Sequence, residues 1–160
     1  MIPVCDLCDA HPDRVQVLEP VFSSYGGRNT FHGAAETIRT HEDNSRVREA
    51  VNEAGDGRVL IVDGGGSLKR SLLGGDLAGK AARNGWAGVV VNGAVRDAAE
   101  LEGEALGVLA LALIPMKTEK RGLGERGVAV TIAGAVVNPG DWIYVDRDGA
   151  IVAREPLHET

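Results

Sequence analysis

The sequence predicts one α/β domain with a central βαβ unit and several short strands after it. Residues 59–62 and 87–91 are continuous apolar runs, which are typical of buried parallel strands. Residues 76–84 lie between them and have the apolar spacing of a helix. Residues 128–153 then hold four short apolar runs separated by turn residues. With 160 residues the chain has the length of one domain (~100–200 residues), so we expect residues 1–160 to form one.

Two strands and a helix are expected before the βαβ unit. Residues 15–18 alternate weakly between apolar and polar side chains, and residues 31–40 are rich in β-branched and small ones, so both predict strands. The apolar period changes to that of a helix over residues 41–54. Asp43 or Asn44 can cap the first turn of that helix.

The order strand, helix, strand predicts that the two strands of the unit are parallel and joined by a right-handed crossover. A further strand is expected over residues 106–114, and the composition of residues 117–127 predicts a charged loop. Asp148-Gly149 lies between two apolar runs, which indicates a hairpin. The last short strands are expected at residues 128–132, 135–137, 142–145 and 150–153.

Charge and hydropathy exclude several classes of protein. The chain has 17 basic and 23 acidic residues, a net charge of −6, and no basic face of the kind that nucleic-acid binding requires. Direct binding of RNA or DNA is therefore not expected. No stretch approaches the ~20 apolar residues of a membrane span, and the first residues lack the features of a signal peptide. We expect a cytoplasmic protein that binds no membrane.

Cys5 and Cys8 form a Cys-x-x-Cys pair near the start of the chain. Redox pairs of this spacing usually follow a strand, and zinc sites need two further ligands. No strand is expected before residue 5, and the four histidines lack ligand spacing. The favoured interpretation is that both sulfurs lie on one face of a short N-terminal helix.

Glycine is abundant and clustered. The chain has 22 glycines, about twice the usual ~7%, and nine of them fall within residues 64–93. Such clustering favours a ligand cradle over general turn content. A phosphate loop over residues 74–80 is disfavoured, because Ala81 stands where Ser or Thr must hold magnesium. A nucleotide or S-adenosylmethionine site at residues 62–66 is also disfavoured, since no helix follows directly.

A third interpretation joins the two loops of the βαβ unit. Residues 74–77 open a helix, where free amides and the helix dipole favour an anion. Arg96 and Asp97 follow the next parallel strand, so the loops can face one another. The Arg fork suits a carboxylate, and the Asp can ligate a hard divalent cation. Glu100 follows three residues later and lies on the same helix face as Asp97 if Asp97 begins a helical turn. The alternative is a local Arg96–Asp97 ion pair beside a solvated Glu100.

The segment from Gly74 to Asp97, which ends in Gly93-Ala94-Val95-Arg96-Asp97, resembles a known family. It is similar to the family of regulator of ribonuclease activity A and the class II 4-hydroxy-4-methyl-2-oxoglutarate aldolases. The likeness extends to residues 24–27, 31–35, 124–125 and 139–141, so it covers nearly the whole chain. The resemblance implies a compact swivelling β/β/α-type domain, commonly a homotrimer with active sites near the subunit interfaces.

The resemblance also implies roles for individual residues. In catalytic members the glycine loop and the motif Arg hold the substrate, and the motif Asp binds Mg²⁺ or Mn²⁺; here Arg96 and Asp97 take the last two roles. Glu100 fills an acidic position that catalytic members tend to carry. Many members have Asp directly after the first loop glycine, whereas this chain has glycine there and an acid one residue later. The substrate-binding loop is Gly74, Gly75, Asp76 and Leu77.

The expected function is metal-dependent cleavage of 4-hydroxy-4-methyl-2-oxoglutarate into two pyruvates, with oxaloacetate decarboxylation as a side activity. Both reactions release pyruvate as its enolate, whose charge a divalent cation stabilises. A Schiff-base route needs a desolvated lysine, and no lysine here has an apolar setting. The alternative is a non-catalytic regulator that binds a ribonuclease E-type enzyme by protein–protein contact. Glu100 favours the enzyme.

Overall fold

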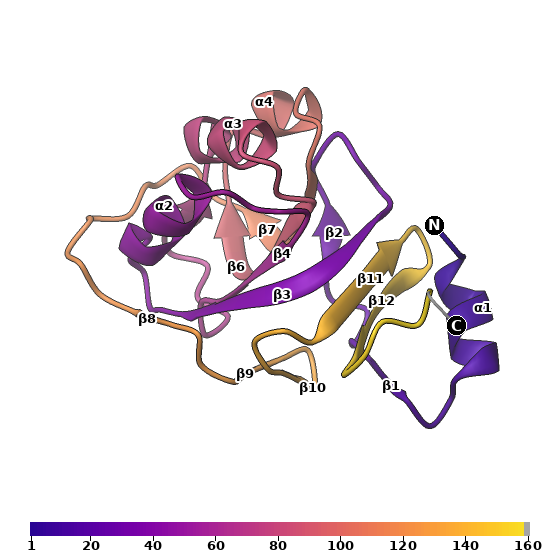
Figure 1. The fold of residues 1–160 in the computed structure, drawn as a ribbon. Helices are drawn as coiled ribbons and strands as arrows, with labels where there is room; N and C mark the ends of the chain where they lie inside the picture. Colours follow the sequence, from indigo (N-terminus) through magenta and orange to yellow (C-terminus); the bar gives the residue numbers. More distant parts are fainter. Residues whose placement is uncertain (159–160) are drawn as a thin grey trace.

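One long strand, β3 (Phe31–Arg39), joins the two halves of the main sheet in the computed structural model, which describes residues 1–158 (Figure 1). Its first residues pair antiparallel with β11 (Trp142–Asp146), and its last five pair parallel with β4 (Val59–Asp63). The sheet runs in the order β1-β12-β11-β3-β4-β6-β7-β2. The side chains of β3 alternate between buried and half-buried along most of its length. This pattern is typical of a strand that packs more tightly on one face than on the other.

The parallel half of the sheet contains the βαβ unit. β4 pairs parallel with β6 (Gly88–Val95), and β6 pairs parallel with β7 (Gly107–Leu113). The prediction of parallel strands around a helix is therefore confirmed. A short strand, β5 (Ser71–Leu73), pairs with the far end of β6 and leads directly into the helix. The loops after β5 and β6 consequently leave the sheet at the same edge.

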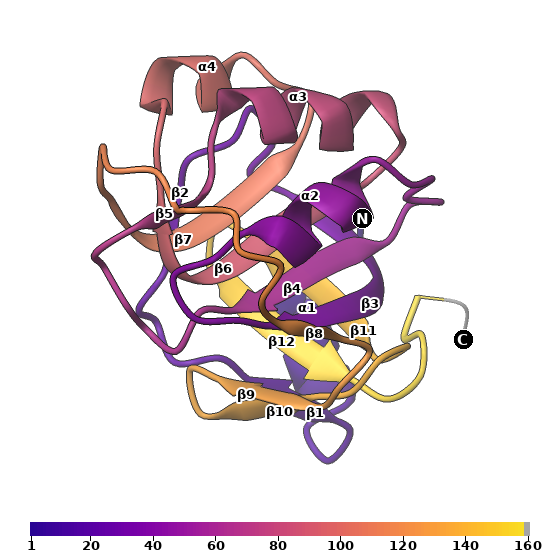
Figure 2. The same ribbon diagram turned by 90° about the vertical axis from the view of Figure 1, so that its left-hand side faces the viewer.

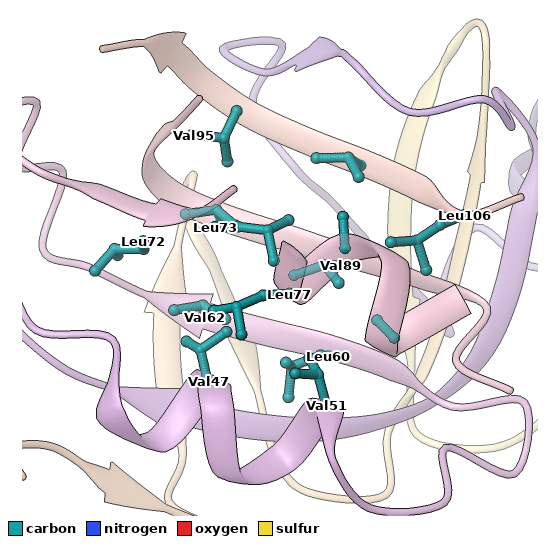
Figure 3. Packing of buried hydrophobic residues seen from close by; sticks show 14 of the residues in the cluster. Val47, Val51, Leu60, Val62, Leu72, Leu73, Leu77, Val89, Val95 and Leu106 are labelled. Atoms are coloured by element: carbon teal, nitrogen blue, oxygen red, sulfur yellow. The ribbon is translucent and has the colours of Figure 1, made fainter. Parts of the chain in front are cut away.

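Helices α2 (Ser45–Val51), α3 (Gly75–Arg83) and α4 (Ala98–Glu102) cover one face of these strands (Figure 2). The core lies between helices and sheet, where aliphatic side chains from both layers interdigitate (Figure 3). It includes the fully buried indole of Trp86. Burial of each such side chain contributes roughly 1.5–3 kcal/mol, so this layer holds the helices against the sheet. The residues labelled in Figure 3 are Val47, Val51, Leu60, Val62, Leu72, Leu73, Leu77, Val89, Val95 and Leu106.

The opposite face of the parallel strands packs against the antiparallel strands near the C-terminus. The predicted hairpin at Asp148-Gly149 is confirmed, since β11 pairs antiparallel with β12 (Gly149–Ala153). β12 also pairs with β1 (Val15–Val17), and β9 (Val130–Ile132) forms a separate hairpin with β10 (Ala135–Val137). The three layers (helices, parallel strands, C-terminal strands) agree with the expected β/β/α arrangement.

Helix α3 ends in a complete Schellman motif. Gly85 has a φ of +83°, a left-handed conformation that glycine adopts without strain. Its amide donates to the Ala82 carbonyl at 3.3 Å, and the Trp86 amide donates to the Ala81 carbonyl at 3.0 Å. This glycine of the cluster therefore terminates the helix and turns the chain into β6.

Some boundaries differ from the predictions. The helix expected over residues 41–54 begins only at Ser45, because Glu42 is left-handed (φ +52°). The strand expected over residues 87–91 continues to Val95, because β5 gives it a further partner. The strand expected from residue 128 begins at Val130. Two strands of two residues each were not predicted. β2 (Ser23–Ser24) pairs with β7, and β8 (Glu125–Arg126), which lies in the expected loop at residues 117–127, pairs with β3.

The N-terminal helix α1 (Val4–Ala10) packs against β11 and β12. Its two cysteines are free thiols that differ in exposure: Cys8 contacts the small cluster under the helix, whereas Cys5 is exposed. Asp148 raises the pKa of the Cys5 thiol, and burial raises that of Cys8, so both changes disfavour the reactive thiolate. Within residues 1–158, no helix is long and apolar enough to cross a membrane.

Candidate functional site

The two loops of the βαβ unit meet through a hydrogen bond. The backbone amide of Gly75, the first residue of α3, donates to Asp97 Oδ2 at 2.8 Å. Asp97 stands immediately before α4 in a left-handed conformation (φ +65°, ψ +52°), which Asp tolerates better than most residues. This backbone turn aims its carboxylate back at α3. The expected proximity of the two loops is therefore present.

A polar cavity of about 270 Å³ opens where these loops meet. All of the substrate-loop residues predicted from the sequence line it, together with Arg96 and Asp97. We call it the polar cavity. Its lining residues are Asn44, Arg48, Ser71, Gly74, Gly75, Asp76, Leu77, Lys80, Arg96, Asp97, Lys117, Thr118 and Lys120.

The start of α3 offers donors to an anion in this cavity. The first intrahelical bond runs from the Ala78 amide to the Gly74 carbonyl at 3.0 Å. The amides of Asp76 and Leu77 precede it, and amides at that position have no acceptor within a helix. They carry the positive end of the helix dipole. Gly74 lies close to both predicted residues, because an added Cβ would be 2.9 Å from Asp97 Oδ2 and 3.3 Å from Arg96 Nε.

Arg96 is only loosely paired with its neighbour. Its Nε lies 4.0 Å from Asp97 Oδ2, and one terminal nitrogen lies 3.4 Å from the Pro115 carbonyl. A bidentate Arg–carboxylate pair has contacts of about 2.7–2.9 Å, so the local ion pair uses little of the guanidinium. With 38% of its side chain exposed, Arg96 retains donors for a carboxylate in the cavity.

Glu100 lies on the other side of Gly75. It lines an adjoining surface hollow that shares Gly75, Asp76 and Lys80 with the polar cavity. A Cβ added to Gly75 would overlap Glu100 Oε2. The Glu100 carboxylate thus fills the volume that an acidic side chain at position 75 would occupy. Glycine at position 75 therefore leaves room for the Glu100 carboxylate.

Four basic residues of the cavity were not predicted from the sequence, and one of them, Lys80, belongs to α3 itself. Arg48 comes from α2, and Lys117 and Lys120 come from the segment after β7. Arg48, Lys117 and Lys120 line the cavity together with the loops of the βαβ unit, and we call these three residues the basic wall. Nothing in their local sequence identifies them, because a lone Arg on a helix and a pair of Lys in a charged loop are ordinary surface features.

Buried polar contacts attach the basic wall to the fold. The Thr118 hydroxyl donates to Asn44 Oδ1 at 2.7 Å, and both side chains are buried. The fully buried Asp43 carboxylate accepts the amides of Ser45 at 2.8 Å and Arg121 at 2.5 Å. Burial raises the pKa of Asp43, but these and neighbouring hydrogen bonds outweigh burial and lower it overall. The carboxylate therefore stays ionised and holds residues 117–124 against the start of α2.

The donor set suits a hydrated hard cation. Within residues 1–158 no three His, Cys, Asp or Glu side chains cluster as a metal cage. Mg²⁺ commonly binds through one or two carboxylates and keeps several waters, so a complete cage is not required. Asp97 Oδ2 accepts the Gly75 amide, and the carboxylate is 39% exposed at the cavity. The residues present therefore fit a cation that the substrate helps to ligate.

The other glycine-rich interpretations are not supported by the arrangement. Gly64 is wedged against Leu72 and the Asn92 carbonyl, and the 64–66 loop lines none of the polar cavity. β5 separates that loop from α3. Gly79 is buried inside α3, where a phosphate loop would need it before the helix.

Comparisons with known proteins show what this chain is similar to. The family model described as "RraA-like: Aldolase/RraA" matches residues 4–152. A protein of Alkalilimnicola ehrlichii named "Putative 4-hydroxy-4-methyl-2-oxoglutarate aldolase" is 54% identical over 156 residues, covering 98% of this chain and 97% of that protein.

Two solved structures share the fold over nearly their whole length. One is described as the RNA-processing inhibitor RraA from Thermus thermophilis, with a TM-score of 0.94, 47% identity, and coverage of 98% of this chain and 94% of that chain. The other is described as S-adenosylmethionine:2-dimethylmenaquinone methyltransferase from Geobacillus kaustophilus HTA426. It has a TM-score of 0.97 and 42% identity, and 99% of each chain is covered.

Proposed function

This chain belongs to the RraA-like (Aldolase/RraA) family, and on that premise we propose that it is a divalent-metal-dependent aldolase. Its substrate is 4-hydroxy-4-methyl-2-oxoglutarate, which it cleaves to two pyruvates, and it decarboxylates oxaloacetate as a side reaction. The observation that carries the proposal is the Gly75–Asp97 hydrogen bond, because it assembles anion donors and a carboxylate ligand in one cavity.

Binding of the 2-oxo acid end is assigned to two elements. The open amides at the start of α3 and the Arg96 guanidinium can both donate to the substrate carboxylate, each through a charge-assisted hydrogen bond. Asp97 would hold Mg²⁺ or Mn²⁺ beside it. The cation would supply Lewis-acid stabilisation of the negative charge that develops on the 2-oxo group.

Cleavage breaks the C3–C4 bond and leaves its electron pair on C1–C3 as pyruvate enolate, so the C4 hydroxyl must lose its proton as the C4 carbonyl of the other pyruvate forms. The enolate then takes up a proton at C3 to give the second pyruvate. We assign Glu100 as the acceptor of that proton, directly or through one water. Its carboxylate lies against Gly75, where an added Cβ would overlap Oε2, so it is next to the start of α3. Decarboxylation of oxaloacetate passes through the same enolate, and the same donors would hold it.

The direct test is pyruvate release from 4-hydroxy-4-methyl-2-oxoglutarate and from oxaloacetate, with Mg²⁺ or Mn²⁺ and then with chelator. We expect turnover that the chelator abolishes and that added metal restores. Arg96→Ala should lower kcat/KM by about 100-fold, the value of one or two lost charged hydrogen bonds. Absence of metal-dependent turnover on both substrates would refute the aldolase proposal.

A second candidate function is regulation of a ribonuclease E-type enzyme by protein–protein contact. It is favoured by the likeness to a structure described as an RNA-processing inhibitor, at 47% identity. The net charge of −6 is consistent with contact to a protein and not to RNA. Titrating the chain into a ribonuclease E assay tests it, and loss of inhibition with Asp97→Asn would link the two functions.

The proposal includes a homotrimer whose cavities lie near the subunit interfaces. A trimer would have three times the 16.8 kDa mass of this chain. Light scattering after size exclusion measures this mass directly, and a monomer at micromolar concentration would contradict the trimer.

A further inference from the structure

We propose that a further cavity, between the two ends of the main sheet, binds a small apolar molecule that carries one protonated amine. We call it the seam cavity. It shares no lining residue with the polar cavity, so its ligand is independent of the proposed aldolase activity. The residues that line the seam cavity are Val17, Leu18, Glu19, Pro20, Phe22, Ser24, Asn29, Leu109, Asp146, Arg147, Asp148, Gly149 and Ala150.

Both ends of the sheet border the seam cavity. At one end β12 pairs with the edge strand β1, and at the other end β7 pairs with the edge strand β2. Each of these four strands contributes one lining residue, namely Val17, Ala150, Leu109 and Ser24. The sheet therefore curls far enough for its two ends to enclose one hollow. The mouth of a barrel-like sheet is a common place for a ligand site.

The floor of the seam cavity is apolar. Leu18, Leu109 and Ala150 belong to the core cluster on the sheet face opposite the helices, and Phe22 packs against that cluster. These three core residues keep 5–8% of their surface exposed, whereas most members of the cluster keep 1% or less. Val17 lies beside them and is 63% exposed. An apolar ligand would remove this remaining surface from water, which favours its binding.

The rim of the seam cavity has an excess of negative charge. Its ionisable side chains are three carboxylates, Glu19, Asp146 and Asp148, and one base, Arg147. Among residues 1–158, none of the ion pairs uses any of these four side chains. Asp146 is held in place, because its two oxygens accept the amides of Val4 at 2.8 Å and Asp148 at 2.9 Å. Carboxylates around a hollow with apolar walls favour a cation in it.

Size and charge together select the class of ligand. The seam cavity encloses about 500 Å³, which lies within the usual range of about 300–1,000 Å³ for ligand pockets. A 2-oxo acid does not suit it, because the rim repels an anion and the floor offers no donors to a carboxylate. A bare metal ion would leave the apolar floor uncovered. An apolar body with one protonated amine matches both the floor and the rim.

Three probes that share a phenyl ring and a three-carbon chain test the site: 3-phenylpropylamine, 3-phenylpropan-1-ol and 3-phenylpropanoate. NMR titration of the full chain reports affinity and location together. We expect the amine to bind about fivefold more tightly than the alcohol, as one partly exposed ion pair implies, and the acid to bind most weakly. The shifted methyl signals should be those of Leu18, Leu109 and Ala150. No saturable binding of the amine, or shifts confined to another surface, would overturn the proposal.

A charge variant tests the rim without disturbing the fold. Glu19→Gln/Asp148→Asn changes two exposed acids and leaves Asp146 with its backbone contacts. The matched control is Asp13→Asn/Glu155→Gln, which removes two exposed acids outside the seam cavity. The rim variant should bind the amine no more tightly than the alcohol, with unchanged affinity for the alcohol, while the control keeps the fivefold preference. An equal preference in both variants would refute the role of the rim.

A second copy of this chain is the competing occupant of the seam cavity. If copies cover the cavity in solution, the amine will bind only after the protein is diluted to monomer. Light scattering at each protein concentration identifies that case, and it would overturn the ligand site. Binding that does not change with the oligomeric state supports the site.

Discussion

The Gly75 amide and the Asp97 carboxylate, joined at 2.8 Å, connect two loops that lie 22 residues apart in the sequence. The bond uses the first amide of α3, which has no acceptor within the helix, and one oxygen of the carboxylate. It therefore satisfies a helix end and orients a candidate metal ligand at the same time. A change at Asp97 can be designed to separate these two roles.

Asp97→Asn should abolish metal-dependent turnover without unfolding the protein. The Asn carbonyl oxygen can still accept the Gly75 amide, whereas the charge that holds a divalent cation is lost. We expect pyruvate release to fall by about 10³-fold or more, corresponding to several kcal/mol of lost Lewis-acid stabilisation. Thermal unfolding should be unchanged, and Asp13→Asn, an exposed acid that does not line the cavity, is the control. Near-normal turnover would move the metal ligand elsewhere.

The contact between Gly75 and Glu100 predicts that the acid can be moved from one position to the other. Glu100→Ala should lower kcat by about 10²-fold or more, which is the usual contribution of a general base. Adding Gly75→Asp should recover at least part of that loss, because its side chain enters the space that Glu100 vacates. Gly75→Asn in the same background keeps the shape without the base, so it should recover nothing. A kcat of Glu100→Ala equal to that of wild type would exclude Glu100 as the proton acceptor.

The sequence predicts one half of the candidate site and not the other for a physical reason. Arg96 and the start of α3 follow two parallel strands, and such strands end at the same edge of a sheet whatever the rest of the fold does. Arg48 and Lys120 come together only through tertiary contacts, such as the Asn44–Thr118 bond between residues 74 apart. A contact between residues so far apart leaves no signal in the local sequence pattern.

The same distinction applies to the fold. The strands at β4 and β6 were predictable because a continuous apolar run is itself the signal of a doubly buried strand. β2 and β8 have two residues each, which is too short for any period to show. They are strands because β7 and β3 lie beside them. The left-handed backbone of Glu42, which precedes the late start of α2, is likewise not signalled by the local apolar period.

Asp43→Asn should loosen the attachment of the basic wall. The buried carboxylate accepts two backbone amides in charge-assisted bonds, and we expect its replacement to cost about 2 kcal/mol of unfolding free energy. Its pKa is lowered in the folded state, so its contribution is present at neutral pH and is lost as the pH falls below the ordinary value of 3.8. Urea unfolding of wild type and variant should therefore differ at pH 7 and converge in acid. Glu119→Gln, an exposed acid of the same segment, should show no such difference.

His32 predicts a second pH dependence, at milder acidity. Its ring stacks on Tyr144 with centroids 5.7 Å apart and meets His158 edge to face at 5.1 Å. Burial lowers the pKa of His32 below 6.5, and the positive charges of His158 and the N-terminus lower it further. The unfolded chain then binds this proton more readily than the folded one, so stability is highest above pH 6.5 and falls as the pH drops below it. His32→Phe keeps an aromatic ring without the titration, and its unfolding free energy should fall less between pH 7.5 and 5 than that of wild type. An equal fall in both proteins would assign the acid sensitivity to other groups.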